Sequence, residues 1–204
     1  MAKYENIRAL AKKQLQTVTE SSDRWKEFLR TAAIAYNYSF PNQLLIYAQN
    51  PTATAVADMD YWNKNAGRRV KRGAHGTAVF DTRANSPRLR YLFDISDTIP
   101  IHEISEALPW AVTDQNWKPV WDKIIVDNYA DSIQSALLMI STSYVAQRSA
   151  MFTTALEKAV DGSSLQWAKP NEQRRLFLQI VTQSCLYMAA LRCGVDTARL
   201  DLSA

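Results

Sequence analysis

Apolar positions in the first fifty residues recur with the period of an α-helix. Over residues 2–19 they stand at positions 7, 10, 11, 15 and 18, which predicts a mostly polar helix with one apolar stripe. A second stripe runs from Trp25 to Tyr36, directly after an N-cap signal at residues 21–23. Pro41 suits the first turn of a third helix over residues 42–49, which Asn50 and Pro51 end. The chain is therefore expected to begin with three helices.

The period then changes. Asp58 is a plausible cap for a short fourth helix that runs through Trp62 and stops at Gly67. Residues 69–71, 77–80 and 88–93 read as short strands, connected by residues 72–76 and 85–87. In the last strand alternate residues 89, 91 and 93 are apolar and are expected to share the core face, with Arg88 and Arg90 on the other. We expect a small antiparallel sheet with a hairpin within residues 64–90.

The second half is predicted to be helical. Residues 97–118 are irregular and contain Pro100 and Pro109, with Pro119 directly after them. Residues 129–160 contain no helix breaker before Asp161 and Gly162. A final helix is expected over roughly 171–193. The predicted fold class is α+β: N-terminal helices packed on a small antiparallel sheet, then an all-helical half. The predicted domains are residues 1–98, a connector over 99–118, and a helical region over 119–204.

Composition is that of a globular protein. Of 204 residues 47% are apolar, which is enough for a core, and no apolar run approaches the length of a membrane span. The polar N-terminus has no apolar signal core, so a cytoplasmic location is expected. Cys185 and Cys193 are eight residues apart on a predicted helix, about 12 Å along its axis, which exceeds disulfide reach. They are expected to be reduced, buried thiols.

Charge is unevenly distributed. Residues 1–94 hold 15 basic and 8 acidic residues, a net of +7, and residues 95–204 hold 9 and 12, a net of −3. Residues 64–90 contain eight Lys and Arg residues and a single acid, Asp81. Three of the five glycines of the chain lie in the same region, at positions 67, 73 and 76. Such an asymmetry indicates a polyanion partner for the first half.

Spaced motifs mark the same region. They read YSFPNQLLIYAQNP over residues 38–51, ATAVA over 53–57, Trp62, GRRVKRG over 67–73, GTAV over 76–79 and FDISDT over 93–98. In order and spacing they resemble the N-terminal domain of the ArdC antirestriction family, over about residues 25–98. Related domains open the large multidomain proteins of conjugative elements in Gram-positive bacteria. The resemblance implies a single-stranded DNA-binding domain encoded on a mobile genetic element.

The residues themselves agree with that implication. Lys and Arg contact phosphates, glycines allow close backbone approach, and aromatic rings stack on bases. The candidate DNA-binding residues are Tyr38, Asn42, Gln43, Trp62, Lys64, Arg68, Arg69, Lys71, Arg72, Gly73, His75, Arg88 and Arg90. Tyr47 and Tyr61 are further candidates for stacking. Structural alternatives stay open: Asn42 and Gln43 as a cap or a tie between helix and hairpin, Trp62 as core, and the basic hairpin as a solvated face.

Catalysis is not expected. ArdC proteins join this domain to a zincin-like metallopeptidase part, in which an H-E-x-x-H helix and a later acidic residue bind zinc. Here His102 and Glu103 are followed by Glu106 where the second His belongs, and Gln183 stands where the later carboxylate belongs. No phosphate loop, G-x-S-x-G elbow or C-x-x-C pair is present either. We therefore expect no catalytic residue, metal or cofactor, and the 119–204 helices are either a zincin-like remnant or an independent helical support.

A different class of function remains as the alternative. Residues 133–156 are apolar and rich in Met and Ala, which suits either core packing or a protein partner that the chain inhibits or recruits. The residues that would contact such a partner are Leu137, Leu138, Met139, Ile140, Tyr144, Met151 and Phe152.

Overall fold

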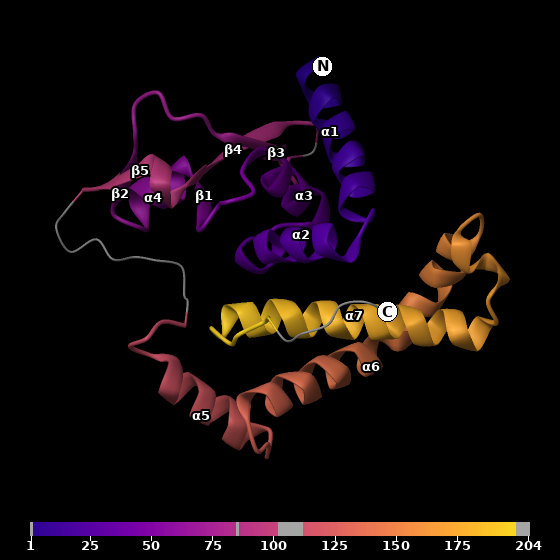
Figure 1. Cartoon of the computed structure of the whole chain (residues 1–204). Helices are drawn as coiled ribbons and strands as arrows, with labels where there is room; N and C mark the ends of the chain where they lie inside the picture. The colour runs from indigo at the N-terminus through magenta and orange to yellow at the C-terminus, as the bar shows by residue number, and fades with distance from the viewer. Residues whose placement is uncertain (1, 85, 102–111, 199–204) are drawn as a thin grey trace. The chain divides into compact units, whose positions relative to one another are not determined.

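The computed structural model describes residues 2–84, 86–101 and 112–198, and the chain divides into two compact units, residues 1–111 and 112–204 (Figure 1). The first unit combines helices with strands and the second is helical, so the predicted α+β class is confirmed. The first unit includes a strand at residues 98–100, which lies beyond the predicted domain end at residue 98.

Three helices form one end of the N-terminal unit: α1 (Ala2–Val18), α2 (Ser22–Ile34) and α3 (Phe40–Gln49) (Figure 1). The Ser21 side chain caps α2 by accepting a hydrogen bond from the N–H of Arg24. The middle of the predicted apolar stripe is buried, at Phe28, Leu29, Ala32 and Ala33, whereas Trp25 is half-buried and Tyr36, beyond the end of α2, is exposed. Leu45 and Ile46 of α3 carry this packing into the main core, where they meet strand residues.

The unit contains two small antiparallel sheets. The larger has the order β1 (Val56–Asp58), β4 (Leu89–Asp94), β3 (Thr77–Phe80), and the smaller pairs β2 (Arg68–Val70) with β5 (Thr98–Pro100). The expected pairing of the strands at 77–80 and 88–93 is confirmed by β3 and β4, but the strand at 69–71 was placed wrongly, because β2 pairs with β5 and not with β3. The Lys71 N–H extends the β2–β5 pairing to the Asp97 carbonyl oxygen, at 2.8 Å. β1 and β5 were not predicted, and at three residues each they are too short to show a period.

The predicted core face of β4 was also wrong. Leu92 is fully buried and Asp94 is 4% exposed, whereas Tyr91 is 39% exposed. The buried face carries Arg90, Leu92 and Asp94. Because two of these three residues are charged, the sequence pattern does not identify this face as the core face. Leu92 packs there with Val79, Leu45 and Ile46. The opposite face is covered only in part.

A second cluster covers the β1 end of that opposite face. Asp58 caps α4 (Met59–Lys64) as predicted, accepting from the N–H of Tyr61 at 2.9 Å. Trp62 of α4 is fully buried among Ala55, Ala57 and Ala66, with Phe93 packed against them. A single 3₁₀ turn, η1 (Ile95–Asp97), then connects β4 to β5. The elements around β2, β5 and α4 lie together at the end of the unit away from α1 (Figure 1).

The C-terminal unit consists of α5 (Trp117–Asp127), α6 (Ile133–Val160), the short η2 (Ser164–Trp167) and α7 (Pro170–Arg192). α6 and α7 pack along each other (Figure 1), and the indole N–H of Trp121 donates to the Cys193 carbonyl oxygen at 2.7 Å. Cys185 and Cys193 are free thiols, and burial raises the pKa of both. Among the described residues, no helix is long and apolar enough to span a membrane.

Candidate nucleic-acid interface

Asn42 joins α3 to the free edge of the larger sheet. Its Nδ2 donates to the Phe80 carbonyl oxygen and its Oδ1 accepts from the Phe80 N–H, both at 2.9 Å. Gln49 does the same two turns later, with its amide bonded to the N–H and carbonyl of Ala78 at 3.0 and 2.9 Å. The two amides thus replace a neighbouring strand along β3. Asn42 is 1% exposed with both amide ends used, so it leaves the candidate DNA-binding set.

Three other candidates hold the fold in place. The Gln43 amide donates to the Ala35 carbonyl at 3.1 Å, the Tyr38 hydroxyl to the Val56 carbonyl at 2.9 Å, and the Trp62 indole to the Phe93 carbonyl at 2.9 Å. Trp62 is fully buried and presents no ring face to a base, so it is a core residue and not a stacking platform. Burial raises the pKa of Tyr38, against the opposing charge of Arg90, whose guanidinium carbon lies 5.3 Å from the ring centre.

Asp94 performs a similar task at the other side of the sheet. Its carboxylate accepts the N–H groups of Thr54 at 2.7 Å and of Ala55 and Ser96 at 3.0 Å, which joins the 53–55 segment to the end of β4. Burial acts to raise the pKa of Asp94, but these N–H groups outweigh it and hold the pKa below its ordinary value. The FDIS part of the motif region therefore supports the fold.

The lowered pKa predicts an acid-sensitive contribution to stability. Since the folded pKa lies below the unfolded one, near 3.9, the stabilisation is complete above about pH 4 and is lost as pH falls through the folded pKa. Asp94→Asn should flatten this dependence and lower the free energy of unfolding at neutral pH, because an amide cannot accept all three N–H groups. Urea titrations of both proteins at several pH values measure this, and an unchanged acid slope in Asp94→Asn would contradict it.

Several candidate cations are engaged within the unit. Lys64 pairs with Asp60 at 3.3 Å and Arg90 with Asp58 at 3.6 Å. The Nε of Arg68 donates to the Thr98 hydroxyl at 2.6 Å, across the β2–β5 sheet. Arg68 and Arg90 hold local structure, and Arg90 is largely covered, with 20% of its side chain exposed, whereas the exposed Lys64–Asp60 pair contributes little to stability. Lys71 donates to the Ser96 carbonyl at 2.7 Å, which ties the segment after β2 to η1.

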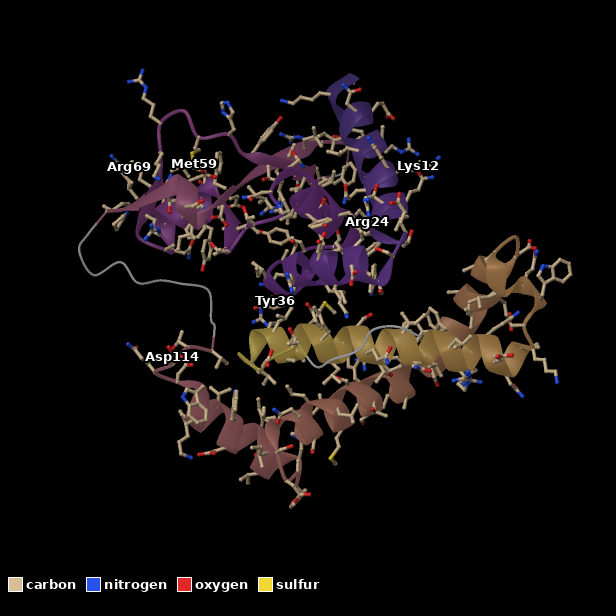
Figure 2. The ribbon with its side chains drawn as sticks, in the orientation of Figure 1. Lys12, Arg24, Tyr36, Met59, Arg69 and Asp114 are labelled. Carbon is tan, nitrogen blue, oxygen red and sulfur yellow. The ribbon has the colours of Figure 1, made fainter. Side chains whose placement is uncertain are left out.

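Four candidate side chains remain exposed and unpaired. Arg69 on β2, Arg72 and His75 in the following segment, and Arg88 just before β4 have no hydrogen bond or ion pair within the described ranges 2–84, 86–101 and 112–198. Figure 2 shows Arg69 at the outer margin of the N-terminal unit. Gly73 has φ +84°, so the chain turns between Arg72 and His75 in a conformation that favours glycine. The unpaired cations thus lie on β2, on this turn and at the start of β4.

The structure adds two residues that the sequence reasoning missed. Tyr91 of β4 has an exposed ring, and the Lys3 ammonium of α1 lies 5.0 Å from its centre. Gly76 approaches the same strand so closely that a Cβ there would stand 2.8 Å from the Tyr91 Cβ. The segment that carries Arg72 and His75 therefore ends against Tyr91. Correct assignment of the two faces of β4 would have identified the ring.

The part of the chain that the structure describes contains no group of three His, Cys, Asp or Glu side chains placed to hold a metal. The proposed degenerate zinc motif, His102, Glu103 and Glu106, lies outside the described residues. Gln183 is half-buried on α7, and its Oε1 is buried with no hydrogen-bond partner in the described part.

Comparison of the chain with protein-family models, with curated proteins and with solved structures found no match. The ArdC resemblance therefore stays a prediction that rests on the motifs. Many of the motif side chains hold the fold, among them Tyr38, Asn42, Gln49 and Trp62. The polar groups of these side chains are therefore already used within the unit.

Proposed function

We propose that the chain binds single-stranded DNA through its N-terminal unit, without sequence preference and without catalysis. The observation that carries the proposal is a set of exposed side chains, the cations Arg69, Arg72 and Arg88 together with His75, that no carboxylate pairs with among the described residues. Three arginines with free guanidinium groups can each contact a phosphate and release counterions. The ArdC resemblance supports the same function, and with it a role in conjugation or antirestriction.

Four of the acids in this region are occupied. Asp58 pairs with both Arg83 and Arg90, and Asp60 pairs with Lys64. The N–H and guanidinium of Arg83 hold the pKa of Asp81 below its usual value. Asp94 is buried. Asp97 of η1, beside β2, has no ion pair among the described residues, but the three exposed arginines outnumber it, and this net positive charge favours a polyanion over a neutral ligand.

A titration with labelled oligonucleotides of equal length, one single-stranded and one double-stranded, tests the proposal. Fluorescence anisotropy should give tighter binding to the single strand, and the affinity should fall steeply as salt rises, with a slope of about −0.7 per phosphate contact. Equal affinity for the duplex, or binding that salt does not weaken, would contradict it.

A second candidate function rests on α6. Of the seven residues proposed to contact a protein partner, Leu137 is buried and Phe152 packs on Phe177, with ring centres 5.8 Å apart. The others are between 39% and 74% exposed: Leu138, Met139, Ile140, Tyr144 and Met151. Such exposure favours a protein-interaction surface on the C-terminal unit. A partner that stays bound through nuclease treatment during purification would support it.

A further inference from the structure

We propose that Tyr91 is the platform on which a base of the bound single strand stacks; this inference rests on the proposed function. Tyr91 lies on the central strand of the larger sheet, opposite Ala78 of β3, and the residue is 39% exposed. Leu92 lies on the face of β4 that packs against Leu45 and Ile46, and Tyr91 lies on the opposite face. An apolar aromatic face left accessible on a sheet is the type of surface that single strands use.

Gly76 connects this ring to the cationic segment. A Cβ at position 76 would stand 2.8 Å from the Tyr91 Cβ and 3.0 Å from the Phe93 ring, so the backbone passes directly beside the strand. Arg72 and His75 precede this contact by four residues and one residue. Single-stranded DNA whose phosphates contact these side chains therefore runs next to Tyr91, so that one of its bases can reach the ring.

The contact of Lys3 with the Tyr91 ring indicates that the ring face is accessible to a cation or a base. Its ammonium lies 5.0 Å from the ring centre, and the side chain is exposed. A surface cation–π contact contributes about 2- to 5-fold to an equilibrium, whereas a stacked base contributes about 5- to 150-fold. The base therefore displaces the ammonium, and the flexible Lys3 side chain is left close enough to pair with a neighbouring phosphate.

Several other partly or fully exposed rings of the unit have less suitable surroundings. Tyr36, which is 53% exposed, lies in the turn after α2 and outside the cationic 69–88 segment. Tyr61 is 41% exposed, but it stands on α4 beside Asp60, three residues after Asp58. The Tyr47 hydroxyl donates to the Glu27 carboxylate at 3.0 Å. Phe40 packs edge-on against Phe28. Carboxylates repel a phosphate backbone, whereas Tyr91 combines exposure with an ammonium over its ring and cationic residues in the adjoining segment.

The test compares two single strands of equal length and charge, oligo-dT and an abasic oligonucleotide. Wild type and Tyr91→Phe should bind oligo-dT about 10-fold more tightly than the abasic strand. Tyr91→Leu, which keeps an apolar side chain but removes the ring, should lose that preference while its affinity for the abasic strand is unchanged. Tyr61→Leu, the matched control, should behave as wild type.

A measurement on the wild type alone makes the test independent of how the variants fold. Photocrosslinking to an oligonucleotide that carries 5-iodouracil should attach the DNA to the peptide containing Tyr91. A crosslink elsewhere, or a Tyr91→Leu variant that keeps the base preference, overturns the stacking site but leaves DNA binding standing. If the wild type binds neither oligonucleotide at low salt, the proposed function fails as well.

Discussion

Replacing Arg69, Arg72 and Arg88 together with serine is expected to weaken binding to a single-stranded oligonucleotide by about 100-fold or more at about 50 mM salt. These arginines are exposed and unpaired within the described residues, so their removal leaves no buried partner without a hydrogen bond. The free energy of unfolding should therefore change by less than about 0.5 kcal/mol. Anisotropy titrations measure the affinity, and urea denaturation measures the stability.

The choice of residues matters, because neighbouring cations support the fold. Arg68 bonds the Thr98 hydroxyl and Lys71 the Ser96 carbonyl, so a variant that includes them mixes lost binding with lost structure. A matched control removes the same charge elsewhere, as Lys12→Ser, Lys13→Ser and Lys26→Ser on α1 and α2. Figure 2 shows Lys12 and Arg69 far apart on the N-terminal unit. If the control loses as much affinity as the arginine variant, the binding site is misplaced.

Asn42→Leu is expected to destabilise the N-terminal unit by about 2–5 kcal/mol. The substitution removes both 2.9 Å hydrogen bonds to Phe80 and leaves its N–H and carbonyl facing an apolar side chain. Since Gln49 protects only Ala78, the outer end of β3 loses its partner. Urea denaturation gives the free energy, and amide exchange at Phe80 should accelerate with it.

Asn37→Leu is the control for this prediction. Asn37 is exposed in the turn between α2 and α3 and has no hydrogen bond within the described residues. Its replacement should change stability by less than about 0.5 kcal/mol. An Asn42 variant as stable as the Asn37 variant would show that the edge amides contribute little.

The helices and the α+β class were predictable because their signals are local. Ser21 and Asp58 cap the helices that the sequence assigned to them, and β3 occupies the expected residues 77–80. The pairing of β2 was not predictable, since its partner is a three-residue strand some thirty residues away with no period of its own. Such pairing is decided by tertiary contacts, here the bonds of Arg68 and Lys71 to the η1–β5 segment.

The candidate site was predictable in charge but not in detail. The basic excess located the region, and Arg69, Arg72, His75 and Arg88 are exposed there. Polar motif residues such as Asn42 instead satisfy backbone groups, which no sequence pattern separates from ligand contacts. Tyr91 was missed because Arg90 and Asp94 lie on the buried face of β4, where alternation places apolar residues.

The most direct test of DNA binding by the exposed arginines is the salt dependence of affinity. The slope of log affinity against log salt should be shallower by about 2 in the variant that lacks Arg69, Arg72 and Arg88 than in the wild type, because three phosphate contacts are lost. The Lys12, Lys13 and Lys26 variant should keep the wild-type slope. Equal slopes for the arginine variant and the wild type would contradict the proposed interface.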